Sequence, residues 1–177
     1  MLKTKYLILS GLFATITALL AQISIPLPFS PVPITGQIFG VFLIGTILGG
    51  RWGAISMLTY VFLGAIGLPV FHNAQGGLHI VLGPTGGYLW GFVLGSYLLG
   101  KTVEKRNSYL SIILGMFLCL AATYSLGVLQ LSFIAGLNLR QGLLLGAAPF
   151  LPLDIVKLFA ASGLSLSVRQ RLLKAVY

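Results

Sequence analysis

The stretch YLSIILGMFLCLAATYSLGVLQLSFI, residues 109–134, contains no charged side chain. A transmembrane α-helix needs about 20 predominantly apolar residues, so this run is long enough to cross a bilayer. Further apolar runs lie on both sides of it, and we expect each to be a spanning helix: residues 6–24, 35–49, 52–67, 85–101 and 148–168. The sequence therefore predicts an all-α membrane protein with six transmembrane helices, folded as a single domain over residues 1–177.

The composition supports a membrane protein as well. Hydrophobic residues make up 57% of the chain and charged residues only 7%, and the mean hydropathy is +1.01, which is far above the value for soluble domains. The start of the chain, MLKTKY, also resembles the basic start of a secretory signal peptide. The apolar run that follows is longer than a signal-peptide core, so we expect it to be retained as a helix.

The charged residues predict how the chain is oriented in the membrane. The chain has eleven Lys and Arg residues but only two acidic residues, Glu104 and Asp154, so its net charge is +9. If both termini are cytoplasmic, nine basic residues lie on the cytoplasmic side, Arg140 alone lies outside, and Lys157 falls within the last span. The basic residues form no continuous stripe with interleaved aromatics, so we do not expect nucleic-acid binding. We expect a multi-pass membrane protein in contact with lipid, with both termini in the cytoplasm.

Two of the predicted outer loops are unusually apolar. Loop 1, IPLPFSPVPI at residues 25–34, and loop 3, LPVFHNAQGGLHIVLGP at residues 68–84, contain no Lys, Arg, Asp or Glu. Water-exposed loops of this length are normally polar. We therefore expect loops 1 and 3 to fold back over the protein and to cap a ligand pocket.

An ion pair is predicted inside the last span, PFLPLDIVKLF at residues 149–159, where Asp154 and Lys157 are three positions apart. Each such residue costs roughly 2.5 to 3.5 kcal/mol in the middle of a membrane. At this spacing the two side chains share one helix face and can neutralise each other, so a purely structural pair is one interpretation. A ligand-binding role is favoured, because ionisable groups within a membrane usually serve function.

Three predicted spans begin near the outer surface, close to Thr35, Thr85 and Asp154. Helix N-termini carry unpaired N–H groups and a partial positive charge, so they favour an anionic ligand group. Gly86 and Gly87 would let such a group approach the backbone, although a turn with a tight helix contact explains the PTGG sequence equally well. The segments that begin at Thr35 and Thr85 also resemble each other, which leaves an internal repeat open.

Other residues at the same end have two interpretations each. Asn73 in loop 3 offers a hydrogen-bond donor and an acceptor, or it is a turn residue. Tyr88 and Trp90 either flank an apolar ligand or belong to the aromatic belt at the membrane surface. On the first helix, Ser10, Ala14 and Ala18 form a stripe of small side chains, suited to a partner helix or to internal contacts.

Several functions are excluded. His72 and His79 have no acidic or Cys neighbour, so we expect neither a metal site nor a cofactor. The segment GSYLLGKT, residues 95–102, has the letters of a phosphate loop but closes a helix instead of opening one, so we expect no ATP hydrolysis. An intramembrane protease would need a nucleophile with a nearby base, which the predicted spans do not offer, so we expect no enzyme. A channel or passive structural subunit is the other alternative.

Four blocks in order carry a family resemblance: SPVPITGQ at 30–37, GLPVFHNAQGG at 67–77, GPTGGYLWGF at 83–92 and PFLPLDIVKL at 149–158. With these blocks the chain resembles the BioY family, the biotin-specific S-components of energy-coupling-factor (ECF) vitamin transporters. The resemblance implies a six-helix fold in a bacterial plasma membrane and capture of biotin from the outer side. It also implies uptake with an ECF transmembrane coupling subunit and two ATPase subunits as partners.

The resemblance also implies roles for individual residues. Asp154 and Lys157 match the family's polar pair, Asn73 its loop asparagine, and Ala14 with Ala18 its contact with the coupling subunit. The expected biotin-binding residues are Asp154, Lys157, Asn73, Thr35, Gln37, Thr85, Gly86, Gly87, Tyr88 and Trp90. We expect Asp154 to accept from a ureido N–H, Tyr88 and Trp90 to flank the rings, and the Gly86–Gly87 backbone to receive the carboxylate; the reverse orientation of biotin stays open.

Overall fold

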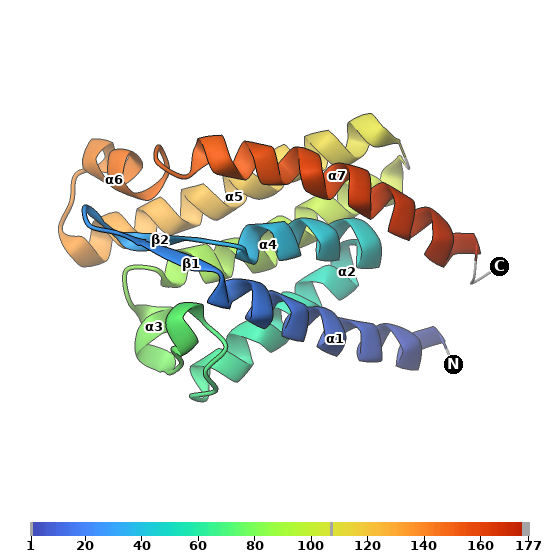
Figure 1. Ribbon diagram of the computed structural model, residues 1–177, viewed down its shortest axis with the longest axis horizontal. Helices are drawn as coiled ribbons and strands as arrows, with labels where there is room; N and C mark the ends of the chain where they lie inside the picture. The colour runs from blue at the N-terminus through green and yellow to red at the C-terminus, as the bar shows by residue number, and fades with distance from the viewer. Residues whose placement is uncertain (1, 107, 175–177) are drawn as a thin grey trace.

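A computed structural model describes the backbone of residues 2–106 and 108–174 (Figure 1). In chain order the elements are α1 (Leu2–Gln22), β1 (Ser24–Leu27), β2 (Ser30–Thr35), α2 (Gln37–Ala65), the 3-10 turn η1 (His72–Ala74), α3 (Leu78–Leu82), α4 (Gly86–Lys105), α5 (Tyr109–Ala135), α6 (Leu139–Gly146) and α7 (Leu151–Lys174). The fold is mostly helical, as predicted. Loop 1 departs from the all-α prediction, because β1 and β2 pair there as an antiparallel hairpin.

Helix α2 covers most of two predicted spans, 35–49 and 52–67, and folds back on itself between them. Gly49 has φ +82° and ψ 179°, a backbone conformation outside the helical region that glycine adopts without strain. Gln37 Nε2 donates to Tyr60 Oη at 2.7 Å, whereas a straight helix would separate these residues by about 34 Å. The two arms of α2 therefore lie side by side and antiparallel.

The predicted number of spanning helices is not confirmed as a count. The described residues form seven α-helices, of which α3 and α6 are short and α2 is bent. Within the described ranges, four helical segments are long and apolar enough to cross a membrane: Thr4–Gln22, Gln37–Ala65, Tyr109–Ala135 and Leu151–Arg169. The start of α1 and the end of α7 lie at one end of the bundle, and the hairpin, α3 and α6 lie at the other (Figure 1).

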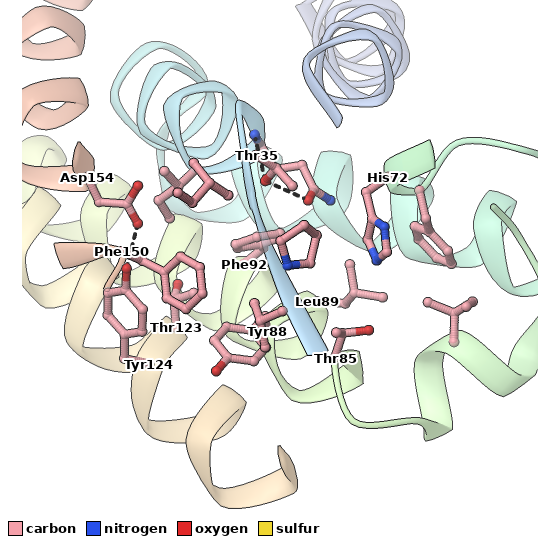
Figure 2. A pocket seen from close by; sticks show the side chains of 17 residues that line it. Thr35, His72, Thr85, Tyr88, Leu89, Phe92, Thr123, Tyr124, Phe150 and Asp154 are labelled. Atoms are coloured by element: carbon pink, nitrogen blue, oxygen red, sulfur yellow. Dashed lines mark hydrogen bonds between the residues drawn. The ribbon is translucent and has the colours of Figure 1, made fainter. Parts of the chain in front are cut away.

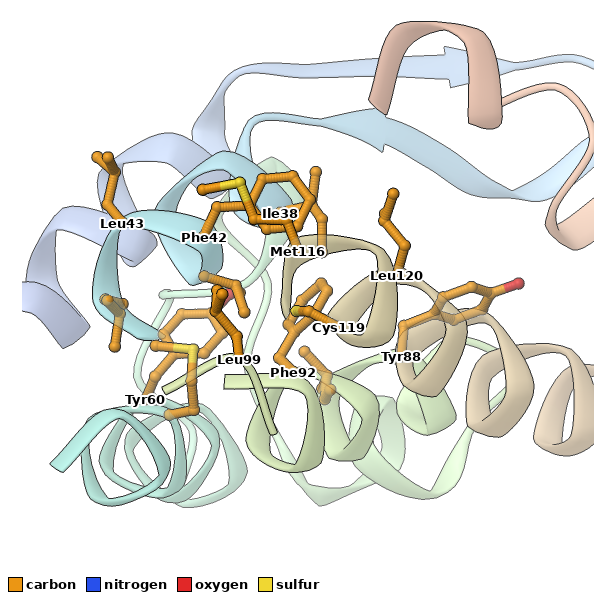
Figure 3. Close-up of a cluster of buried hydrophobic side chains, with 14 of the residues drawn as sticks. Ile38, Phe42, Leu43, Tyr60, Tyr88, Phe92, Leu99, Met116, Cys119 and Leu120 are labelled. Carbon is orange, nitrogen blue, oxygen red and sulfur yellow. The ribbon is translucent and has the colours of Figure 1, made fainter. Parts of the chain in front are cut away.

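The core lies where α2, α4 and α5 cross, around fully buried residues such as Phe42, Leu99 and Met116 (Figure 3). Glycines let these helices approach closely, and a Cβ atom added to Gly100 would lie 2.1 Å from the Gly50 nitrogen. Large apolar side chains also cover the outside of the helices, with Phe133 85% exposed. An apolar exterior around a tightly packed interior fits a protein that is surrounded by lipid.

The turn of α2 is held by Glu104, near the end of α4. Its Oε1 accepts a hydrogen bond from the Gly50 N–H at 2.8 Å, and its Oε2 pairs with Lys101 Nζ at 2.9 Å. Arg169 of α7 donates to the Thr46 carbonyl of α2 close to the same turn. Glu104 therefore satisfies a backbone donor that the break at Gly49 leaves free.

We expect Glu104→Ala to lower the thermal midpoint of the purified protein more than Glu104→Gln does. The glutamine retains a carbonyl acceptor for the Gly50 N–H, whereas the alanine leaves this donor unpaired, at a difference of about 1 kcal/mol. Lys101→Gln is the matched control, since it removes only an exposed ion pair that contributes little. Equal midpoints for the two Glu104 variants would show that the Gly50 contact does not stabilise the turn.

Candidate functional site

A pocket lies at the end of the bundle that carries the hairpin and α3, and its space, including the opening to solvent, is about 650 Å³. Most of the wall is apolar: Val32, Pro33, Ile34, Ile38, Phe71, Ile80, Leu89, Phe92 and Phe150. The polar lining residues are Thr35, Gln37, His72, Thr85, Tyr88, Thr123, Tyr124 and Asp154 (Figure 2). Both loop 1 and loop 3 contribute to this wall, as expected of loops that fold back over the protein.

Loop 1 reaches the pocket through β2. The Ser30 hydroxyl donates to the Leu145 carbonyl of α6 at 2.8 Å, and this hydrogen bond joins the hairpin to α6. At the other end of β2 the Thr35 hydroxyl donates to Gln37 Oε1 at 2.9 Å, and Gln37 in turn donates to Tyr60. Thr35 and Gln37, both predicted from the sequence, therefore share one polar patch of the pocket wall.

Asp154 lines the pocket and is 8% exposed. Its Oδ1 accepts from Lys157 Nζ at 2.7 Å, and its Oδ2 accepts from the Tyr124 hydroxyl at 2.6 Å. A buried carboxylate costs much free energy unless it is paired and hydrogen-bonded in this way. The predicted pair therefore exists, and Tyr124 is a third member that the sequence analysis missed.

Lys157 is not among the residues that line the pocket. Besides Asp154, its ammonium group donates to the Thr35 carbonyl at 2.8 Å. Lys157 thus joins α7 to the end of β2 and fixes the orientation of the carboxylate. Its position is that of a supporting residue behind the pocket wall, rather than a side chain facing the space.

Tyr88 and Tyr124 form an aromatic corner of the pocket. Their rings meet edge to face with centroids 6.4 Å apart, and the Tyr88 hydroxyl donates to the Gly146 carbonyl at 2.7 Å. The four-residue repeat of a helix places Phe92 on the same side of α4 as Tyr88, and both line the pocket. Trp90 does not line it and is 45% exposed, so the outward, membrane-facing alternative describes Trp90 in this structure.

Gly86 and Gly87 serve close contacts of α4. A Cβ atom on Gly86 would lie 1.8 Å from the Val81 carbonyl oxygen, and one on Gly87 would lie 2.2 Å from that of Leu126. The Gly86 N–H is already paired with the Gly83 carbonyl at 3.1 Å. The tight-contact interpretation therefore describes both glycines, and of the PTGG segment only Thr85 lines the pocket.

Asn73 was predicted as the loop-3 contact with the ligand, but the residue of this pair that lines the pocket is His72. Asn73 is exposed and adopts the left-handed conformation, φ 54° and ψ 36°, which asparagine tolerates better than most residues. His72 lines the pocket instead. Two successive polar residues in a loop give no sequence signal for which one points inward, because their directions depend on local φ and ψ values.

The small stripe of α1 is largely internal. Ser10 and Ala14 are each 2% exposed, and the Ser10 hydroxyl donates to the Trp52 carbonyl of α2 at 3.3 Å. Ala18 is half-buried against the core. The predicted contact of Ala14 with a partner would thus require α1 to separate from α2, whereas Ala18 is partly accessible.

Comparisons with known proteins agree on one family. Residues 1–174 match the BioY family. A protein of Thermotoga maritima named "Biotin transporter BioY" is 40% identical, with 94% of this chain and 96% of that protein covered. A protein of the same name from Rhizobium etli is 36% identical, with 94% of each chain covered.

A solved structure gives the same assignment at the level of the fold. The crystal structure of an S-component for biotin from an ECF-type ABC transporter matches with a TM-score of 0.88 and 27% sequence identity. The match covers 95% of this chain and 92% of that chain. The chain therefore belongs to the BioY family.

Proposed function

We propose that this chain binds biotin in the pocket between loops 1 and 3 and acts as the substrate-binding S-component of an ECF-type transporter. The names of its relatives and the S-component to which its fold is similar support this function. The observation that carries it is a single hydrogen-bonded carboxylate, Asp154, in the wall of an otherwise mostly apolar pocket. Such a wall suits a ligand with one polar head and an apolar body.

Biotin combines a ureido head that donates and accepts hydrogen bonds, a fused apolar ring pair and a carboxylate tail. The ureido head belongs beside Asp154, with Thr35 and Gln37 as further acceptors and donors that line the pocket. The ring pair belongs against the aromatic side chains of Tyr88 and Phe92. Lys157 acts in this arrangement by orienting Asp154, and neither Trp90 nor Asn73 is included as a contact.

The chain is proposed to be one integral-membrane domain with six crossings, two of them made by the arms of α2. Both termini would be cytoplasmic, which places the pocket and loops 1 and 3 at the outer surface. Biotin would then enter from outside after the loops open. Closure of apolar loops excludes water and strengthens each polar contact in the pocket.

The energy for release would come from partners: a transmembrane coupling subunit and two ATPase subunits. The segment 95–102, which has the letters of a phosphate loop, lies within α4, where backbone N–H groups are used by the helix. Chemistry on the substrate is not part of the proposal, since the relatives are named as transporters. A partner helix would contact α1 at Ala18 and its exposed neighbours.

Equilibrium binding of labelled biotin to the purified chain tests the function. We expect saturation near one biotin per chain, competition by unlabelled biotin and none by thiamine, an unrelated vitamin. A channel, a passive subunit or an enzyme without affinity for biotin would give no saturable signal. Absence of saturation with folded protein would contradict the proposal.

A further inference from the structure

His72 is a polar side chain in the pocket wall with no assigned role. Both of its ring nitrogens are inaccessible to solvent, and neither has a hydrogen-bond partner within the described part of the chain. Nearly all buried polar side-chain atoms in proteins have such a partner. An unpaired imidazole that borders a ligand pocket therefore points to a hydrogen bond with the ligand.

The surrounding loop holds His72 in this direction. Gln22, the last residue of α1, donates from Nε2 to the Phe71 carbonyl at 3.0 Å and accepts at Oε1 from the Ala74 N–H at 2.8 Å. Asn73 and Ala74 both have φ 54°, a conformation that is uncommon for residues other than glycine. The backbone on both sides of His72 is thus fixed by α1, and the fixed turn directs His72 inward and leaves Asn73 exposed.

His72 is not needed to anchor the loop by apolar contact, because Phe71 does so. The Phe71 ring is 1% exposed and meets the Tyr60 ring edge to face with centroids 5.5 Å apart. It also lies against Gly64, where an added Cβ would be 2.1 Å from the Phe71 ring. A polar residue that lines the pocket next to such an anchor, with both ring nitrogens unpaired, is better explained by recognition than by packing.

The two ends of the pocket differ in charge. Figure 2 shows Asp154 and Tyr124 on one side of the space and His72 with Thr85 on the other. A carboxylate ligand group would be repelled by Asp154, and the ammonium of Lys157 is already engaged with Asp154 and the Thr35 carbonyl. The end with His72 and Thr85 offers N–H and O–H donors. An anionic group is therefore better placed at that end.

We propose that His72 donates a hydrogen bond to the carboxylate tail of biotin and so makes the pocket prefer the acid to its neutral derivatives. The inference rests on the proposed function, biotin binding in this pocket, and adds the orientation of the ligand and a residue that selects for its tail. Burial lowers the pKa of His72 below its usual value in the ligand-free protein, and a neutral imidazole still has one N–H to donate.

The test compares biotin with biotinamide, in which the tail is a neutral amide, on the full-length protein and two variants. The unmodified chain should bind biotin about tenfold more tightly than biotinamide, because hydrogen bonds to a charged acceptor are the stronger ones. His72→Leu should lower biotin affinity about thirtyfold and biotinamide affinity only about threefold, because the neutral amide is the weaker acceptor, so that the preference disappears. His72→Gln retains a donor of similar reach and should keep most of the preference.

The outcomes separate the inference from the function it rests on. If the unmodified chain does not bind biotin, the proposed function fails. If it does, equal losses for biotin and biotinamide in His72→Leu, or no loss for either, overturn the assignment of His72 to the tail. Unchanged thermal midpoints of both variants exclude a folding defect, and His72→Gln decides the case if the leucine variant is unstable.

Discussion

Replacing Asp154 with asparagine is expected to weaken biotin binding by about a hundredfold. The carboxylate accepts from Lys157 and Tyr124 on the protein side and, in the proposed complex, from a ureido N–H. Hydrogen bonds to charged groups contribute about 1.5–3 kcal/mol each, and an amide presents one acceptor atom where the carboxylate presents two. Equilibrium binding of labelled biotin to the purified variant measures the loss.

A double variant separates ligand binding from the structural role of the pair. Asp154→Leu alone leaves the half-buried ammonium of Lys157 without its counter-ion, which we expect to destabilise the protein by about 2–3 kcal/mol. Adding Lys157→Met replaces the whole pair by apolar groups of similar volume, a change that is often neutral for stability. The double variant should therefore regain a thermal midpoint close to that of the unmodified chain and still fail to bind biotin.

The contrary result is equally clear. A stable double variant that binds biotin with unchanged affinity would mean that Asp154 and Lys157 serve only each other and the Thr35 carbonyl. The ligand head would then have to lie elsewhere in the pocket. Tyr124→Phe is the matched control, because it removes one hydrogen bond to Asp154 and leaves the charge pair in place. It should weaken binding by about tenfold at most.

The sequence predicts the regular parts of this fold well, because hydrophobic runs and charges in a membrane protein are governed by strong free-energy differences. The ion pair is found by the same reasoning: charges are costly in an apolar span, and their spacing of three residues places them on one helix face. The break at Gly49 is also indicated in the sequence, because it lies at the boundary between the apolar runs 35–49 and 52–67. What hydropathy does not show is that the helix continues through this boundary and folds back.

Side-chain direction is the part that the sequence leaves open. Tyr88 and Trp90 are two positions apart on α4, so they cannot share a helix face, and only contacts with α5 and α6 decide that Tyr88 is the inward one. For His72 and Asn73, the backbone conformation of the loop alone decides that His72 lines the pocket and Asn73 is exposed. Ala14 was a plausible contact for a partner because it is small, yet the same property lets α2 cover it.

Replacing Gln22 with leucine is expected to raise the rate of biotin dissociation by about thirtyfold. Gln22 forms two hydrogen bonds with the backbone of loop 3, each with a net contribution of about 1 kcal/mol. The left-handed residues Asn73 and Ala74 favour a different conformation once these bonds are lost. Loop 3 should therefore open more often, and biotin that enters through open loops can leave the isolated chain by the same route. A chase of labelled biotin with excess unlabelled biotin measures the rate.

Two further variants show whether the hydrogen bonds carry this effect. Gln22→Glu keeps the acceptor for the Ala74 N–H and loses the donor to the Phe71 carbonyl, so its dissociation rate should lie between those of the unmodified chain and Gln22→Leu. Thr15→Val is the control on the same helix, since the exposed Thr15 hydroxyl donates to the Gly11 carbonyl of its own helix, and its rate should not change. An intermediate rate for Gln22→Glu would show that both hydrogen bonds hold loop 3 to α1, which is also the helix proposed to meet a partner. Equal rates for all four proteins would mean that loop 3 is held independently of α1, and the connection would have to be sought in loop 1.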